Sequence, residues 1–434
     1  MIVSADWVLP IDAPPIRDGA VELGADGTIV AVGTAAELGA GERFEQAVIL
    51  PAFVNAHTHL EYAVYAGFGD GLSFGQWIQT HVERKARIGL PEMEAIARLG
   101  AAQCLASGVG TIGDASFSGA AATACADLGL RATVYLEVFG PDASGLAERF
   151  EPARDRLEGT LPDRVRLGVS PHAPYTVGTE LYEACFELGL PVATHLAESA
   201  DEHAWVTTGG GGWEQFADLL VAPLGTTGIR ALAAAGLLDE RVLAAHCVHV
   251  DDEEIELLVR TGTAVAHCPR SNAYLGCGVA PVRAFIDAGV RVGLGTDSPA
   301  STPSFDVFDE LRAAIAGARA REQRPDALSA TEALELATLG AARALGLDDA
   351  IGSLTPGKQA DLAIVSFEDS AFVPWEDPAA AVVLGGSPER VAATLVAGET
   401  RYRRGGMEWH ELTDAARNAR DLLLGLPASS ASSP

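Results

Sequence analysis

The segment from Leu50 to Leu60 reads Leu-Pro-Ala-Phe-Val-Asn-Ala-His-Thr-His-Leu, and it predicts a buried β-strand that ends in two histidines. Side chains alternate along a strand, so His57 and His59 lie on the same face. Two imidazoles that converge at a strand end can bind a divalent metal ion. A lone His-x-His is also common on surfaces and in cores, so its meaning depends on the rest of the chain.

Short apolar segments alternate with Ala-, Leu- and Glu-rich helical segments from about residue 51 to residue 350. This alternation is typical of repeated βα units around a parallel sheet. Eight such units favour an α/β fold of the closed (β/α)8 TIM-barrel type. The expected strands are 52–56, 109–114, 131–138, 165–170, 192–195, 242–246, 264–267 and 290–296.

The segments on either side of this barrel have the character of short β-strands. We expect residues 1–50 and 355–434 to form one small, discontinuous β-sandwich domain, and residues 51–354 to form the barrel. The Ser- and Ala-rich tail, residues 428–434, is expected to be disordered. The strand-like segments are 7–10, 19–23, 28–33, 358–365, 379–384 and 391–396.

Composition limits the classes of partner. The 434-residue chain has a net charge of −29 at pH 7, which argues against nucleic acid and anionic membranes as partners. No apolar run approaches the roughly 20 residues of a membrane-spanning helix. The first residues do not resemble a secretory signal, and the six scattered cysteines are typical of reduced thiols. We therefore expect a cytoplasmic protein.

Polar residues follow almost every predicted barrel strand. A barrel directs the carboxyl ends of its strands to one mouth, where substrate-binding loops also lie. Four or more histidines and an aspartate are therefore expected to meet there. The strand-end groups are His57 and His59, Ser170 to His172, His195 to Glu198, His246, His267 to Asn272, and Thr296 to Ser298.

These segments, in this order and spacing, resemble the amidohydrolase superfamily. Within it they are most similar to the branch of aminopurine and nucleoside deaminases (adenosine, S-adenosylhomocysteine and aminofutalosine deaminases) and related chlorohydrolases. The resemblance covers nearly the whole chain, including the return to the small β domain at residues 352–362. The segments that carry it are 51–61, 170–175, 194–199, 245–250, 267–272 and 293–301.

The resemblance implies one divalent metal ion, most simply Zn²⁺ with Fe²⁺ as the alternative. Binuclear relatives use a carboxylated lysine after strand four, and neither Lys85 nor Lys358 lies there. Without a metal, His195 would be a core histidine and Asp297 a helix N-cap. The implied metal ligands are His57, His59, His195 and Asp297.

The resemblance also assigns catalytic roles. Asp297 would bind the metal and accept a proton from the attacking water, and His246 would orient that water. Glu198, in a His-x-x-Glu sequence, would shuttle the proton to the substrate and then to the leaving ammonia. A solvated surface carboxylate is the alternative for Glu198.

Four further residues are implied in substrate binding. His172 resembles a histidine that contacts the purine ring, and Ser301 matches a serine near the base or ribose. Trp77 would form an aromatic wall, and Glu83 would bind the ribose hydroxyls. The interval from Trp77 to Glu83 is shorter than the resemblance leads us to expect, and a helix through residues 77–87 would leave Glu83 exposed.

The leading hypothesis is a hydrolytic deaminase of a small-molecule 6-aminopurine nucleoside: 6-aminodeoxyfutalosine, S-adenosylhomocysteine, methylthioadenosine or adenosine. Residues 267–278 resemble the aminofutalosine deaminases, and this resemblance favours aminodeoxyfutalosine. The alternatives are a chlorohydrolase or a deaminase of a free base such as guanine, cytosine or a triazine, and a non-catalytic scaffold. A homo-oligomer is left open, as is whether Gly209–Gly212 hinges a lid.

Overall fold

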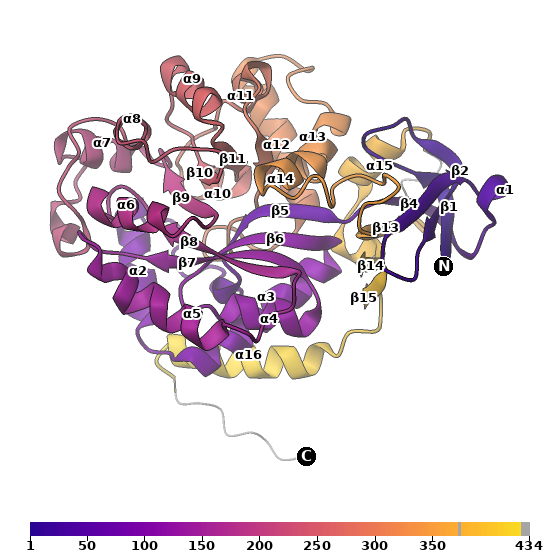
Figure 1. Cartoon of the computed structure of the whole chain (residues 1–434), viewed down its shortest axis with the longest axis horizontal. Helices are drawn as coiled ribbons and strands as arrows, with labels where there is room; N and C mark the ends of the chain where they lie inside the picture. Colours follow the sequence, from indigo (N-terminus) through magenta and orange to yellow (C-terminus); the bar gives the residue numbers. More distant parts are fainter. Residues whose placement is uncertain (372–374, 427–434) are drawn as a thin grey trace.

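A computed structural model of the chain describes residues 1–371 and 375–426, so the expectation for the tail at 428–434 lies outside the described residues. In this part of the chain, eight parallel strands lie side by side in their sequence order at the centre of the larger body (Figure 1). The strands are β5 (Phe53–Thr58), β6 (Val109–Ser116), β7 (Arg131–Val138), β8 (Val165–Pro171), β9 (Val192–Leu196), β10 (Val242–His246), β11 (Ala264–His267) and β12 (Val292–Leu294). The barrel-type fold predicted from the sequence is confirmed.

The first and last barrel strands meet at the mouth. Thr58, at the end of β5, forms an isolated parallel bridge with Asp297, three residues after β12. The Asp297 N–H donates to the carbonyl oxygen of His57 at 2.9 Å. The backbone contact that closes the barrel therefore involves two residues of the predicted metal site.

Helices surround the barrel, and most of them pack against it through small and aliphatic side chains that share one large core. Several begin at a capping residue, such as Ser199 before α7 and Asp251 before α9. The first connection contains η1 (Leu60–Tyr62), α2 (Phe74–Lys85) and α3 (Leu90–Ala106). The others contain α4 (Ala120–Leu128), η2 (Leu146–Phe150), α5 (Glu151–Leu157), α6 (Thr179–Glu187), α7 (Ala200–Thr208), η3 (Glu214–Leu219), α8 (Gly228–Ala234), α9 (Asp252–Thr261), α10 (Pro269–Tyr274), α11 (Val282–Ala288), α12 (Val307–Glu322), α13 (Ala330–Leu336) and α14 (Leu339–Ala344).

Both ends of the chain contribute to a separate mixed sheet beside the barrel (Figure 1). Strand β4 joins the two ends, because it pairs in parallel with β1 and antiparallel with β13. The sheet has its own core of aliphatic side chains. Within the described residues its strand order is β15 (Glu399–Arg403), β14 (Val391–Val396), β13 (Leu362–Ser366), β4 (Glu42–Pro51), β1 (Ile2–Val8), β2 (Ile16–Leu23) and β3 (Ile29–Thr34), and the short helices α1 (Ala35–Leu38) and η4 (Pro388–Arg390) complete it.

The prediction of a strand at residues 379–384 is wrong, because they lie in helix α15 (Pro378–Gly385). Asp377 caps this helix: its carboxylate accepts from the N–H groups of Ala379 and Ala380 at 2.9 and 3.0 Å. The proline in the first turn suits a helix start. The run is apolar on nearly all sides and packs against α12 and α13, so its hydrophobic pattern did not distinguish helix from strand.

The C-terminal helix α16 (Trp409–Leu423) lies within the range that the sequence assigned to the small β domain, but it packs against α3 of the barrel (Figure 1). Ala416 and Ala419 are buried in that contact, and Arg87 donates to the carbonyl oxygen of Leu423 at 2.9 Å. Across the described residues, helices long and apolar enough to cross a membrane are absent.

Candidate metal centre and active site

Three buried imidazoles and a carboxylate converge at the barrel mouth. The Nε2 atoms of His59 and His195 lie 3.3 Å apart. Asp297 Oδ1 lies 3.5 Å from Nε2 of His59 and 3.8 Å from Nε2 of His57. His57 Nε2 has no hydrogen-bond partner among the described residues. The structure therefore brings together the four residues that the sequence proposed as metal ligands.

The hydrogen bonds of two imidazoles test whether a cation fits this cluster. Nδ1 of His59 donates to the carbonyl oxygen of Ala115, and Nδ1 of His195 donates to that of His172, both at 2.8 Å. Because a carbonyl only accepts, each Nδ1 carries a hydrogen, and in the neutral ring Nε2 then carries a lone pair. Two lone pairs 3.3 Å apart repel each other unless a cation lies between them. The donor set therefore fits a divalent metal ion.

Burial, reinforced by the neighbouring imidazoles, lowers the pKa of His57 and of His195. Both imidazoles are therefore neutral at physiological pH, which is the form that binds a metal.

The Asp297 carboxylate is oriented by two hydroxyl groups. Its Oδ2 accepts from Ser271 Oγ at 2.6 Å and from Ser301 Oγ at 2.8 Å, which leaves Oδ1 facing the imidazoles. Ser301 was expected near the substrate, whereas in the structure its hydroxyl is buried against Asp297 and does not line the cavity. Ser298 lines the cavity instead.

Glu198 and His246 face each other beside this cluster. His246 Nδ1 lies 2.9 Å from Asn272 Oδ1, and because an amide oxygen accepts, Nδ1 is the donor. Its Nε2 lies 3.6 Å from Glu198 Oε1. Burial raises the pKa of Glu198, and the nearby charge of Asp297 raises it further. A carboxyl group that is protonated more readily than usual suits a proton shuttle.

The backbone at this mouth is strained. His246 and Asp297 have positive φ angles of 74° and 57°, and Ala197 has 53°. Such conformations cost on the order of 1–3 kcal/mol each and persist where the surrounding structure holds them. Here they turn functional side chains inward at the ends of β10 and β12 and after β9.

Glu202 holds the segment that carries Glu198. Its buried carboxylate accepts from the N–H groups of Ala197 at 2.9 Å, Glu198 at 2.6 Å and Ser199 at 3.4 Å. Burial raises the pKa of Glu202 to about 7, although these hydrogen bonds oppose the shift. The sequence did not identify this residue, yet Ser199 and Glu202 form a capping box that the pattern S-x-x-E predicts.

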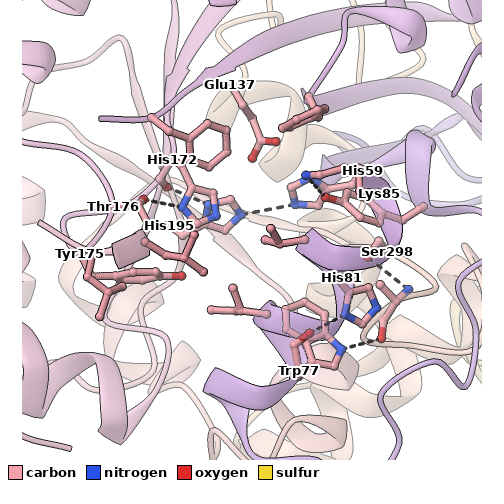
Figure 2. Close-up of a pocket in the computed structure, with 18 of the residues that line it drawn as sticks. His59, Trp77, His81, Lys85, Glu137, His172, Tyr175, Thr176, His195 and Ser298 are labelled. Carbon is pink, nitrogen blue, oxygen red and sulfur yellow. Dashed lines mark hydrogen bonds between the residues drawn. The ribbon is translucent and has the colours of Figure 1, made fainter. Parts of the chain in front are cut away.

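A cavity of about 720 Å³ opens onto this cluster, a size within the usual range for ligand pockets. Figure 2 shows Trp77, His172 and Tyr175 around the same space as His59 and His195. Trp77 and His172, both expected at the substrate, thus line the cavity. Trp77 Nε1 donates to the carbonyl oxygen of Ala300 at 2.9 Å, and His172 Nδ1 lies 2.7 Å from Thr176 Oγ1.

The structure does not bring Glu83, which was expected to bind substrate, to the cavity. Glu83 is exposed, accepts from Gln79 Nε2 at 3.0 Å and does not line the cavity. Residues four apart share a helix face, so Trp77, His81 and Lys85 of α2 line the cavity while Glu83 faces away from it. His81 is also buried and lines the cavity.

A cluster of imidazoles and carboxylates at the carboxyl mouth of a parallel eight-stranded barrel defines this protein as an enzyme of the barrel hydrolase class. The model of the Amidohydrolase family matches residues 48–401, and the chain belongs to this family. It is 33% identical over 420 residues to the 5-methylthioadenosine/S-adenosylhomocysteine deaminase of Symbiobacterium thermophilum, covering 93% of each chain. It is 32% identical over 371 residues to the 5′-deoxyadenosine deaminase of Methanothermobacter thermautotrophicus, covering 83% of each.

Solved structures give the same fold. An adenosine deaminase from Xanthomonas campestris with bound zinc superposes with a TM-score of 0.88 at 29% identity, over 98% of each chain. The zinc complex of atrazine chlorohydrolase from Arthrobacter aurescens TC1 has a TM-score of 0.81 at 23% identity, over 97% of this chain and 99% of that one, which shows the fold alone.

Proposed function

We propose that this enzyme removes the 6-amino group of an adenine nucleoside by hydrolysis and releases ammonia. The observation that carries the proposal is the placement of Glu198, His246 and Asp297 within 4.8 Å of one another, measured between their ligand atoms, in a cavity large enough for a nucleoside. The names of its relatives, which are deaminases of adenosine derivatives, support the same chemistry.

In this proposal His57, His59, His195 and Asp297 bind one divalent metal ion, with zinc favoured because zinc is bound in the Xanthomonas campestris structure. A divalent metal ion held by these residues would lower the pKa of a bound water, so that hydroxide is available as the nucleophile at neutral pH. The remaining steps belong to side chains of this chain.

Glu198 and His246 would direct the proton transfers. Asp297 Oδ1 accepts a proton from the attacking water, and His246 Nε2 fixes the direction of its approach to C6 of the purine. Glu198 donates a proton to the ring nitrogen beside C6. As the C6–nitrogen bond breaks, a proton passes to the amino group, ammonia leaves and the 6-oxo purine forms. One water is consumed for each ammonia released.

The substrate is proposed to be an adenosine derivative, with 6-aminodeoxyfutalosine, S-adenosylhomocysteine, methylthioadenosine and adenosine as the candidates and aminodeoxyfutalosine favoured. The test is ammonia release from the zinc-loaded protein, with the ultraviolet change of the purine as a second signal. The panel also contains guanine, cytosine and a chlorotriazine. Turnover of an adenine nucleoside is expected. Turnover of a free base or a triazine, with every adenine nucleoside inert, would overturn the proposal.

A further inference from the structure

We infer that Asp114, a carboxylate that takes no part in the proposed chemistry, positions the metal ligand His59 and thereby strengthens the binding of the metal ion. Asp114 lies on β6, the strand beside β5, is fully buried and does not line the cavity. The inference rests on the metal-binding part of the proposed function, because it assumes that His59 binds a metal ion.

The chain that leads to His59 leaves the regular ladder between the first two barrel strands. Asn55 pairs with Ile112 and Thr58 pairs with Asp114, so β5 advances by three residues while β6 advances by two. An extra residue of this kind stays unpaired and disrupts the ladder locally, and such irregularities often re-aim side chains beside active sites. The end of β5 therefore needs other contacts to fix its position.

One oxygen of Asp114 supplies these contacts. Its Oδ2 accepts from Thr58 Oγ1 and from the N–H of Leu60, both at 2.7 Å. These donors belong to the residues immediately before and after His59. The Thr58 hydroxyl also lies 3.3 Å from the carbonyl oxygen of Gly113, but its hydrogen bond to Asp114 is the shorter one. A single carboxylate oxygen thus holds the chain on both sides of the proposed ligand.

His59 occupies a position where a capping residue is usual. The short helix η1 begins at Leu60, so His59 is its N-cap residue, but the His59 side chain does not cap the helix. Ser, Thr, Asp and Asn are preferred at an N-cap because a side-chain oxygen accepts from the first N–H groups of the helix. The His59 imidazole does not serve as this acceptor, because its Nδ1 donates to Ala115 and its Nε2 faces the other imidazoles. Asp114 takes over the acceptor role from the neighbouring strand.

Two consecutive residues of β6 therefore fix both the backbone and the ring of His59. Asp114 holds the backbone, and the carbonyl oxygen of Ala115 accepts from Nδ1 at 2.8 Å, which sets the rotation of the imidazole. Thr58 also forms the bridge with Asp297, so a shift of Thr58 would displace two proposed ligands together. Groups that orient a metal ligand typically contribute about 10- to 100-fold to metal affinity.

The second oxygen of Asp114 makes it possible to separate these hydrogen bonds from the negative charge. Oδ1 is buried and has no hydrogen-bond partner among the described residues. In Asp114→Asn the amide oxygen can take the place of Oδ2 and the amide nitrogen that of Oδ1, so the bonds to Thr58 and Leu60 survive. Asp114→Ala removes both bonds. A positioning role therefore predicts that the asparagine variant resembles the parent enzyme and the alanine variant does not.

The experiment measures the zinc dissociation constant of the full chain by competition with a chromophoric chelator. Asp114→Ala should raise this constant about 10- to 100-fold, and Asp114→Asn should stay within about threefold of the parent enzyme. Thr58→Val keeps the shape of the side chain but removes one donor, and it should give an intermediate loss.

Glu254→Ala is the matched control. Glu254 is also buried and also accepts from a threonine hydroxyl, that of Thr227, and from a backbone N–H, that of Asp251, but it lies on α9 and does not line the cavity. This variant should keep the zinc affinity of the parent enzyme. Cobalt(II) gives a second readout, because its visible spectrum depends on coordination geometry. The spectrum should change in Asp114→Ala and stay unchanged in Asp114→Asn and Glu254→Ala.

The outcomes separate this inference from the proposed function. Parent-like zinc affinity in Asp114→Ala, an equal loss in Asp114→Asn, or an equal loss in Glu254→Ala would overturn the inference while the deaminase proposal stands. If Asp114→Ala does not fold, Thr58→Val decides, and parent-like affinity in that variant would overturn the inference. A parent enzyme that binds zinc but releases no ammonia from any nucleoside would overturn the proposed function alone. A parent protein that binds no zinc would overturn both.

Discussion

At the scale of single residues, the site depends on which atom of each side chain is already occupied. His59 and His195 commit Nδ1 to carbonyl oxygens, Asp297 commits Oδ2 to two hydroxyls, and His246 commits Nδ1 to Asn272. The atoms left over, three Nε2 and one Oδ1, belong to two adjoining groups at the barrel mouth, one of imidazoles and one that contains Glu198, His246 and Asp297. Hydrogen bonds to the outer atoms thus decide the chemistry of the inner ones.

Replacing Glu198 by glutamine should separate proton transfer from metal binding. Glutamine keeps the size of the side chain but cannot carry the proton, so turnover should fall on the order of 10²- to 10⁴-fold. Metal content should stay at the parent level, because Glu198 is not among the proposed ligands. Kinetics with adenosine derivatives and metal analysis check this together. A near-normal rate would contradict the shuttle role.

Glu202 is a positioning residue, since it reaches the reaction only through the backbone of Glu198. In Glu202→Gln one oxygen becomes an amide donor, which faces backbone N–H groups that need an acceptor. We expect kcat to fall about tenfold with little change in KM, because Glu198 loses its orientation.

The control for this prediction is Glu332→Gln. Glu332 closes an equivalent capping box on α13, where it accepts from the N–H of Ser329 at 2.8 Å, and it does not line the cavity. The Glu332→Gln variant should lose a similar amount of stability and keep the kcat of the parent enzyme. Equal loss of kcat in both variants would show that the effect of Glu202 is only structural.

At the scale of elements, α2 determines the outer wall of the cavity. Helical periodicity places Trp77, His81 and Lys85 on one face and turns Glu83 to solvent. The resemblance proposed both Trp77 and Glu83, and of these two Trp77 lines the cavity, whereas Glu83 is exposed, as the alternative of a helix through this segment predicted. Reading the face of the helix first would have directed attention to Lys85.

The charge of Lys85 should make the binding of an anionic substrate depend on pH. Burial lowers the pKa of Lys85 to about 8, while Glu137 and Glu61 oppose the shift and Arg149 adds to it. The other titratable neighbours stay neutral near this pH: burial raises the pKa of Tyr62 and lowers the pKa of His81 and of His172. Lys85 is therefore cationic below about pH 8 and neutral above it.

The loss of the positive charge of Lys85 above about pH 8 should weaken the use of an anionic substrate. The ratio of kcat/KM for 6-aminodeoxyfutalosine to that for 5′-deoxyadenosine should be constant below pH 8 and fall about tenfold per pH unit above it. Dividing by the neutral substrate removes the titration of groups that serve both. In Lys85→Arg the ratio should stay constant through pH 10, because a guanidinium does not lose its proton there. A constant ratio in the parent enzyme would contradict the prediction.

At the scale of the whole molecule, the barrel strands were predictable because each has a buried apolar run and almost every one is followed by a polar group. The meeting of these polar groups was predictable because a barrel directs the carboxyl ends of its strands to one mouth. The exceptions are local. Helix α15 is apolar on nearly all sides, so it has no periodicity to read, and the hydroxyl of Ser301 turns towards Asp297, a contact between side chains that no spacing encodes.

The same architecture links the metal site to the stability of the barrel. The proposed ligands lie on β5 and directly after it, on β9, and three residues after β12, and the Asp297 N–H donates to the His57 carbonyl oxygen across this seam. A bound metal ion should therefore stabilise the seam between β5 and β12. Free metal at 100 times its Kd stabilises the folded state by about 2.7 kcal/mol if it does not bind the unfolded chain.

Removing the metal by chelation should lower the thermal unfolding midpoint and increase amide hydrogen exchange at this seam more than between β6 and β7, where the ladder is continuous. Adding zinc back should restore both. His57→Ala provides the control: its seam should exchange quickly with or without zinc, because one ligand is missing. Uniform exchange along the barrel after chelation would show that the metal does not hold the seam closed.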